Sequence, residues 1–144
     1  SGYPGMKILQ FAFDSREESD YLPHNYTHNC VVYTGTHDND TVMGWYDTLK
    51  GADKKLCDDY LRLKNADGEP IPREQLPWEF VRAAMSSVAD LAIIPMQDYL
   101  GLGSEARINI PSTLGINWKW RMGNGDFTKE LAGRIRSMTK LYGR

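Results

Sequence analysis

The sequence predicts an α/β protein built around a parallel sheet, and three apolar runs carry this prediction. Met6–Phe13 is almost continuously apolar, which is typical of a strand covered on both faces. Val31–Thr36 is rich in β-branched and aromatic residues, and Leu91–Ile94 is a short apolar run that a proline ends. Helical patterns lie between the second and third runs and provide the crossover that parallel strands need. Three strands are too few to close a barrel.

The rest of the chain alternates between loops and helical patterns. Asp14–Asn29 is a polar loop between the first two strands, and it is long for a plain connection. In later segments apolar residues recur at helical spacing, with Pro77 suited to a first helical turn and Asp126 to an N-cap. Gly51 is expected to end one helix before the next begins. We predict helices over Thr41–Lys50, Asp53–Lys64, Trp78–Asp90 and Asp126–Tyr142, and about one turn over Met96–Leu100.

Length and composition limit the classes of function. The chain has 144 residues and a net charge of -2, which favours one domain at most and argues against a nucleic-acid partner. No apolar run reaches the roughly 18–20 residues of a membrane span. Cys30 and Cys57 form no CxxC pair, and with no signal peptide in sight they indicate free thiols in a reducing cytoplasm. The chain lacks an initiator Met and enters a strand at once, so we expect a piece of a longer protein.

The stretch Val31–Asp40 holds the strongest chemical signal. It reads as a strand that runs into His37, Asp38, Asn39 and Asp40. In α/β folds ligands bind beyond the carboxyl ends of the strands, where these side chains would lie. The alternative is a capped loop, because Asp and Asn are ordinary turn and N-cap residues. We expect Asp40 to be the cap of the following helix, and His37 with Asp38 to be the pair that carries chemistry.

Two metal patterns were weighed against loop residues without a ligand role. His24, His28 and Cys30 give His-x3-His-x-Cys, but the spacing is loose and no second ligand cluster follows, so zinc is disfavoured. Asp38-Asn39-Asp40 resembles the start of a calcium loop, yet Val42 and Met43 occupy positions that need a polar ligand and a glycine. The sequence therefore predicts no metal site.

The glycine-rich stretch Gly101–Ala106 matches the dinucleotide fingerprint G-x-G-x-x-A. That motif must open a helix, whereas Arg107–Pro111 continues as a polar loop broken by proline. We therefore predict no nucleotide and no other cofactor. Further on, Trp118 and Trp120 stand two residues apart, where they either cover a rim of the fold or form a platform for a sugar ring.

Several of these stretches together resemble the C-terminal part of the 4-alpha-glucanotransferases. This family is also known as amylomaltases or disproportionating enzymes, family 77 of the glycoside hydrolases. The resemblance covers essentially the whole chain, in the family's order, and is carried by Tyr3–Phe13, Val32–Thr41, Leu100–Arg107 and Asn117–Arg121. A smaller departure is Ile116, where the family more often has Gly before Asn-Trp.

The resemblance implies a (β/α)8 barrel related to the α-amylases. Residues 1–144 would be a single partial domain, with Met6–Phe13, Val31–Thr36 and Leu91–Ile94 as the sixth, seventh and eighth barrel strands. The implied reaction moves a segment of an α-1,4-glucan to a new acceptor with retention. The implied partners are α-1,4-glucans and maltooligosaccharides, together with the remainder of the barrel.

The resemblance also implies roles for individual residues. Asp38 matches the family's third catalytic carboxylate, which binds the donor sugar and stabilises the oxocarbenium-like transition state. His37 matches the neighbouring sugar-binding histidine, and Asn109 lies in the loop Gly103–Thr113 that shapes the acceptor subsites. Asn39 and Trp118 complete the expected substrate-binding set. An oxocarbenium-like centre gains from a fixed anion nearby, which agrees with the role implied for Asp38.

The main departure from the family's pattern is the absence of two catalytic residues. Retaining glycosyl transfer needs a nucleophile and a general acid about 5–5.5 Å apart. In the family both stand on strands that precede this chain, and Asp38 with Asp40 would lie on one side of the sugar. We therefore expect the isolated chain to be inactive and, with two unpaired sheet edges, to self-associate. The alternatives are a non-catalytic α/β fragment that binds maltooligosaccharides, and a freestanding α/β domain in which the polar strand end is only a cap.

Overall fold

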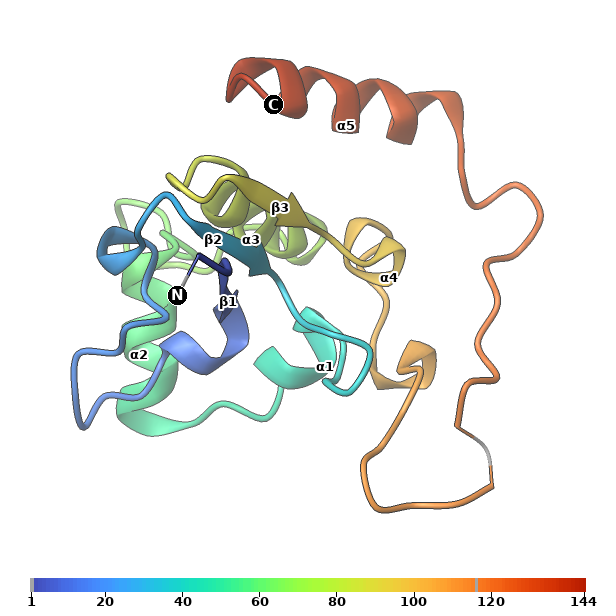
Figure 1. Cartoon of the computed structure of the whole chain (residues 1–144), viewed down its shortest axis with the longest axis horizontal. Helices are drawn as coiled ribbons and strands as arrows, with labels where there is room; N and C mark the ends of the chain where they lie inside the picture. Colours follow the sequence, from blue (N-terminus) through green and yellow to red (C-terminus); the bar gives the residue numbers. More distant parts are fainter. Residues whose placement is uncertain (1, 116) are drawn as a thin grey trace.

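The computed structural model describes residues 2–115 and 117–144, so Ile116 lies outside the described residues. Its strands are β1 (Gly5–Ile8), β2 (Cys30–Tyr33) and β3 (Leu91–Ile93) (Figure 1). They form one parallel sheet in the order β1-β2-β3, which confirms the predicted sheet. β2 is therefore the central strand, and β1 and β3 are the edges.

Register divides the sheet into two faces with different surroundings. Lys7, Val32 and Ala92 lie side by side on one face, where Val32 is buried against Ala84 and Ala89 at the end of α3 (Leu76–Met85). The other face, here named the open sheet face, consists of Met6, Ile8, Val31, Tyr33, Leu91 and Ile93. Met6 is 56% exposed, and Leu91 and Ile93 are exposed as well. The expectation of strands covered on both faces is thus wrong for this chain.

The first strand is shorter than its apolar run. β1 ends at Ile8, and Leu9–Ala12 turns into a 3-10 helix in which Leu9, Gln10 and Ala12 are buried. A short apolar run fits a buried helical turn as well as a buried strand, so hydrophobic pattern alone could not place this boundary.

Five α-helices and four short 3-10 helices complete the described chain. The α-helices are α1 (Val42–Tyr46), α2 (Gly51–Tyr60), α3, α4 (Met96–Tyr99) and α5 (Lys129–Leu141), and the 3-10 helices are Leu9–Ala12, Pro23–Asn25, Arg73–Gln75 and Ser104–Ala106. Each predicted helix is present with shifted ends. Gly51 does not end the first of these helices, because α1 already ends at Tyr46. Gly51 is instead the first residue of α2, and its φ of 57° suits glycine.

Two predicted caps are also wrong by one or two residues. Thr41, not Asp40, caps α1, and its Oγ1 accepts a hydrogen bond from Gly44 N at 3.1 Å. Thr128, not Asp126, caps α5 in the same way. In both places the threonine stands three residues before the amide that it accepts from, which is the N-cap geometry, while each aspartate binds a different group.

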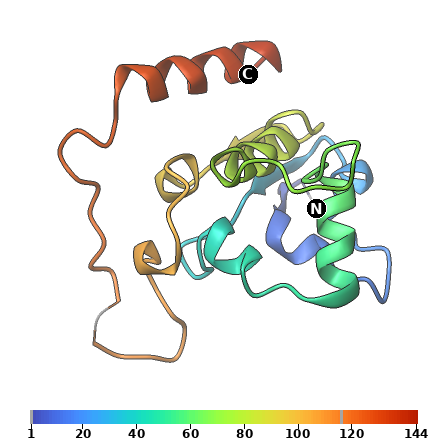
Figure 2. The ribbon, with the colours of Figure 1, turned by 180° about the vertical axis from the view of Figure 1, so that it is seen from behind.

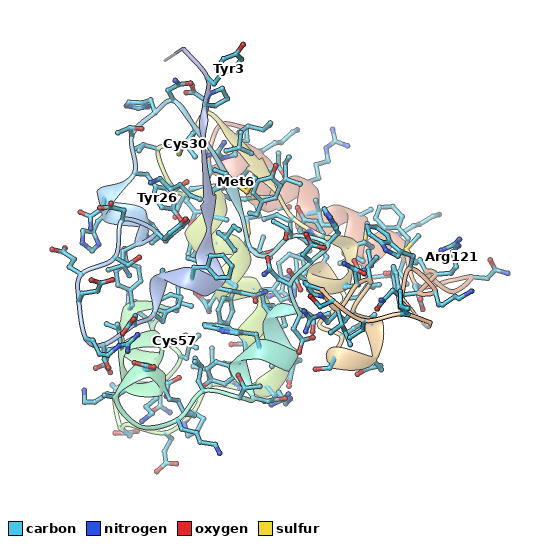
Figure 3. All side chains as sticks on the ribbon, turned by 60° about the horizontal axis from the view of Figure 1, so that its bottom comes forward. Tyr3, Met6, Tyr26, Cys30, Cys57 and Arg121 are labelled. Atoms are coloured by element: carbon cyan, nitrogen blue, oxygen red, sulfur yellow. The ribbon has the colours of Figure 1, made fainter. Side chains whose placement is uncertain are left out.

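The core lies between the first 3-10 helix, α1, α2 and α3. It includes Leu9, Phe13, Val42, Met43, Cys57, Leu63 and Phe80. Cys57 belongs to this cluster and Cys30 to the one behind the sheet, so the two buried free thiols lie in separate places (Figure 3).

The last helix packs on α3 and not on the sheet. Met138 of α5 contacts Trp78, Val81 and Met85, and the Arg134 guanidinium lies 4.0 Å from the centre of the Trp78 ring. Between the 3-10 helix Ser104–Ala106 and α5, residues 107–115 and 117–128 have no regular structure and run along the outside of the molecule (Figures 1 and 2). Over residues 2–115 and 117–144, no helix is both long and apolar enough to cross a bilayer.

Candidate active site

The three strands end at one edge of the sheet, and a buried polar side chain follows each of them. Gln10 comes after β1, Thr34 after β2 and Asp98 after β3, and all three are at most 5% exposed. Buried polar groups need partners, and Gln10 donates to the Asp40 carbonyl while Thr34 donates to Asp98.

A cavity of about 630 Å³ opens at this edge of the sheet, and Asp98 belongs to its lining. One side is the apolar surface of Met6, Ile8, Tyr33 and Ile93 on the open sheet face, and the other is formed by residues 35–41 and 106–108. Its size and its mixture of an apolar wall with convergent polar groups are typical of a small-ligand site.

Asp38 lines this cavity, and neighbouring side chains hold its carboxylate while half of the side chain stays exposed. Its Oδ1 accepts a hydrogen bond of 2.7 Å from Asn109 Nδ2, and its Oδ2 lies 3.4 Å from His37 Nε2. The Arg107 guanidinium donates to the Asp38 backbone carbonyl at 2.8 Å. The Asp38 side chain is 50% exposed, so a carboxylate face remains open to a ligand. The structure thus brings together His37, Asp38 and Asn109, which the sequence predicted as site residues.

Trp118 also lies beside His37. It stands at the C-terminal end of the loop that carries Asn109. Its ring lies against the His37 ring, with centroids 5.1 Å apart and planes inclined by 34°. Its backbone takes a φ of 65°, and its amide donates to the Ile108 carbonyl, which closes the loop 108–118. The exposed indole of Trp118 therefore stands beside the cavity at His37.

Asn39 has a different position from the other predicted site residues. Its Oδ1 accepts hydrogen bonds of 2.8 Å from both Thr36 N and Thr36 Oγ1, which closes a tight turn around His37 and Asp38. Asn39 also lines the cavity. Its carbonyl oxygen thus holds the turn, and a contact with substrate would fall to its amide nitrogen.

Asp40 ties the turn to two other loops. Its Oδ2 accepts from Ser104 Oγ at 2.6 Å, and its backbone carbonyl accepts from Gln10 Nε2 at 2.7 Å. Gly44 makes room for this carboxylate, because a Cβ there would lie 2.6 and 2.7 Å from its two oxygens. At Gly35 a Cβ would similarly meet the Gln10 amide.

Asp98 lines the cavity as well, and sequence reasoning missed it. Its Oδ2 accepts from Thr34 Oγ1 at 2.6 Å and its Oδ1 from Val42 N at 2.9 Å, in a place where Asp98 is 1% exposed. Burial raises the pKa of Asp98 to about 6, although the two hydrogen bonds act in the opposite direction. Its position in the sequence could have pointed to it. Like Asp38, Asp98 follows a short strand by a few residues, at the carboxyl edge of the sheet.

Two of the three residues of the disfavoured zinc pattern, His24 and Cys30, have other partners. The His24 ring binds Glu18 Oε1 at 2.7 Å and the Tyr60 hydroxyl at 2.9 Å, and Cys30 Sγ donates to the Thr27 carbonyl. Within the part of the chain that the structure describes, no three His, Cys, Asp or Glu side chains are grouped so that they could hold a metal ion.

A half-exposed acid–imidazole pair in a cavity at the carboxyl edge of a parallel sheet is the arrangement of an α/β enzyme site. The family model that matches the chain, over residues 1–126, is described as 4-alpha-glucanotransferase. The chain belongs to this family, glycoside hydrolase family 77.

Individual relatives agree with this assignment. A 4-alpha-glucanotransferase of Clostridium butyricum is 50% identical over 145 residues, which cover 100% of this chain and 28% of the relative. A chloroplastic/amyloplastic 4-alpha-glucanotransferase of Arabidopsis thaliana is 46% identical over 99% of this chain and 24% of its own length. The amylomaltase of Streptococcus agalactiae, solved in complex with acarbose, superposes with a TM-score of 0.86 at 38% identity, over 99% of this chain and 28% of that one. The chain thus spans about a quarter of the length of these relatives.

Proposed function

We propose that the protein to which this chain belongs is a 4-alpha-glucanotransferase. It would transfer a segment of an α-1,4-glucan to the 4-position of glucose or of another glucan, with retention. The observation that carries the proposal is the Asp38 carboxylate, which the Asn109 amide and the neighbouring His37 hold at the edge of a cavity in the family's His-Asp-Asn motif.

The same proposal gives the sheet its place in a whole barrel. β1, β2 and β3 would be the sixth, seventh and eighth strands of a (β/α)8 barrel. Two features support this: helix α3 covers one face of the sheet, and the other face is apolar but exposed, as the inner face of barrel strands would be without the strands that pack against it. The remaining strands would cover that open face in the complete protein.

Asp38 would act on the transition state. As an anion beside the sugar it would favour the oxocarbenium-like centre, and hydrogen bonds to ring hydroxyls would strengthen as that centre forms. His37, Asn39 and Asn109 would bind the sugar through their polar atoms, and Trp118 would offer its exposed ring as a stacking surface. The nucleophile and the general acid would come from the part of the relatives that this chain does not cover.

The substrate class follows from the relatives and the cavity together. The Streptococcus agalactiae amylomaltase was solved with acarbose bound. We extend this to the present protein, whose cavity combines an aromatic ring, an imidazole and carboxylate and amide groups, the set that suits a maltooligosaccharide. The isolated 144-residue chain would be inactive, since it would hold only one of three catalytic carboxylates.

Asp38→Asn in the full-length protein tests the function. With maltotriose as substrate, glucose release and longer products would be followed by chromatography. We expect wild type to make both, and Asp38→Asn to lose about 100- to 1,000-fold in kcat, because the neutral amide keeps the shape but removes the anion.

Asp59→Asn is the matched control for this experiment. Asp59 is 59% exposed and pairs only with Lys55 one turn away, so the same change there should leave kcat as in wild type. A wild-type protein that leaves maltotriose untouched would contradict the proposed reaction. An Asp38→Asn variant as active as Asp59→Asn would contradict the role of Asp38.

A second candidate, a binding module, is favoured by the distribution of the site residues. The side chains proposed to contact sugar lie within the described chain, whereas the nucleophile and general acid do not. If the 144-residue chain binds maltotriose in calorimetry, loses that affinity in Asp38→Ala and transfers nothing, this second function holds for the chain.

A further inference from the structure

We propose that Asp98 is a positioning residue for the active site, whose carboxylate holds both ends of the segment 35–41 that carries His37 and Asp38. Its effect on catalysis rests on the function proposed above, while its hold on the segment does not. Nothing in the sequence motifs marks this residue, and the geometry alone points to it.

The hydrogen bonds of Asp98 bracket the segment. Oδ2 accepts from the hydroxyl of Thr34, the residue just before the segment, at 2.6 Å. Oδ1 accepts from the backbone amide of Val42, the residue just after it, at 2.9 Å. One rigid carboxylate thus fixes the distance between the two ends, and residues 35–41 form an arch over it.

Burial of Asp98 and its two donors makes these hydrogen bonds hard to replace. Asp98, Thr34 and Val42 are each at most 1% exposed, so water is not at hand to replace a lost acceptor. The Thr34 hydroxyl and the Val42 amide would have to move to find new partners. A shift of the arch by about 1 Å is enough to cost on the order of 100-fold in rate when it displaces a catalytic group.

The other contacts of the arch cannot replace this bracket. Ser104, which binds the Asp40 carboxylate, is exposed, and Arg107 and Asn109, which bind Asp38, are partly exposed. Gln10 is buried, but it binds only the Asp40 carbonyl at one end. Asp98 holds the entry and the exit of the arch together.

The hold depends on hydrogen-bond geometry and not on charge. In Asp98→Asn the amide oxygen would still accept from Val42 N, and the amide nitrogen would donate to Thr34 Oγ1, because a hydroxyl can turn to accept. Asp98→Leu keeps the branched shape and the number of heavy atoms, with larger methyl groups in place of the oxygens, and both donors lose their acceptor. The two substitutions therefore separate the hydrogen bonds from the presence of a side chain.

The experiment compares four variants of the full-length protein: Asp98→Asn, Asp98→Leu, Thr34→Val and Asp58→Leu. Asp58→Leu is the matched control, since Asp58 is also a buried carboxyl at 3% exposure but binds Tyr46 and Lys54, away from the arch. Transfer kinetics on maltotriose would be measured with hydrogen–deuterium exchange of peptides that cover residues 34–44.

We expect kcat to fall about 100-fold in Asp98→Leu and about 10-fold in Thr34→Val, with KM changed less than about threefold, because Asp38 acts in the transition state. Asp98→Asn should keep kcat within about threefold of wild type, and Asp58→Leu should do so even if its thermal midpoint drops. Exchange in residues 34–44 should quicken in Asp98→Leu and Thr34→Val, and not in Asp58→Leu.

Several outcomes would overturn the proposal. Unchanged exchange over residues 34–44 in Asp98→Leu and Thr34→Val overturns the proposal, and so does a fall in kcat no larger than in Asp58→Leu. An Asp98→Asn variant as slow as Asp98→Leu shows a need for charge and overturns it too. Should Asp98→Leu fail to fold, Thr34→Val, an almost isosteric change, still decides. A wild type without transfer activity ends the proposed function, while the exchange data still test the hold of Asp98.

Discussion

Asp38 and Asp98 show how surroundings divide the work between two carboxyl groups at one sheet edge. Asp38 is half exposed and faces an amide and an imidazole, whereas Asp98 is buried and faces a hydroxyl and a backbone amide. The Asp38 carboxylate is half open to a ligand, whereas both oxygens of Asp98 already accept hydrogen bonds within the protein. Environment, more than residue type, therefore decides that Asp38 is the carboxyl proposed to act on substrate and Asp98 the one proposed to position it.

The buried carboxyl makes stability depend on pH. Its pKa rises from 3.8 to about 6 on folding, mainly through burial, with the Asp40 charge adding to the rise. Between these values the folded protein binds a proton that the unfolded chain gives up, so Asp98 stabilises the fold fully below pH 4 and loses that contribution as pH rises through 6, roughly 3 kcal/mol in all.

Asp98→Asn should remove this dependence, because an amide does not titrate. We expect the thermal midpoint of the variant to gain on that of the wild type as pH increases from 4 to 7, measured by calorimetry in the full-length protein. Profiles that stay parallel over this range would show that Asp98 does not titrate there.

At the scale of elements, two helical glycines are predicted to behave in opposite ways. A Cβ at Gly44 in α1 would press on the Asp40 carboxylate and Ser104 Oγ, whereas at Gly133 in α5 it would meet nothing within 4 Å. Gly44→Ala should cost about 1–3 kcal/mol of stability through overpacking, and it should disturb the Asp40–Ser104 contact.

Gly133→Ala is the control for that substitution. With open space around it, alanine should stabilise α5 by up to about 1 kcal/mol. Thermal unfolding of both variants in the full-length protein checks the pair. Equal shifts in the two variants would show that the Asp40–Ser104 packing does not matter.

The helices and strands also show which parts of the fold the sequence could predict and which it could not. Apolar periodicity was enough for three strands and for every predicted helix, because burial of one face sets that pattern. It failed at Leu9–Ala12, where a buried 3-10 turn and a buried strand have the same composition, and at the caps, where Asp40 and Thr41 are both good capping residues.

The same limits apply to the site. His37, Asp38, Asn109 and Trp118 were predicted and lie together, although their roles toward substrate stay predictions. Asp98 was missed because it lies in one short helical turn, and what distinguishes it is burial beneath the segment 35–41. Burial of that kind arises from tertiary packing between residues 56 or more positions apart, which no local pattern contains.

At the scale of the whole molecule, the open sheet face predicts association of the isolated chain. Met6, Leu91 and Ile93 are exposed on it, and β1 and β3 both present unpaired edges. Analytical ultracentrifugation of the 144-residue chain should therefore show mass increasing with concentration.

Single charges test which surface drives this association. Met6→Lys and Ile93→Lys should reduce it, whereas Leu141→Lys should not, since Leu141 is 69% exposed on α5, away from the sheet. A chain that remains monomeric at all concentrations, or an effect of Leu141→Lys alone, would exclude the open sheet face as the contact surface.

The edge strands also suggest a use for this chain as a reagent. Parallel strands recognise their neighbours through backbone hydrogen bonds, and β1 and β3 have their outer backbone groups free for such pairing within the described chain. A separately produced polypeptide carrying the preceding part of a family member would find those groups, the apolar face and the Asp38 arch already in place. If the proposed function holds, mixing the two inactive pieces should restore glucan transfer, so that recovered sugar release would report when the two partners meet.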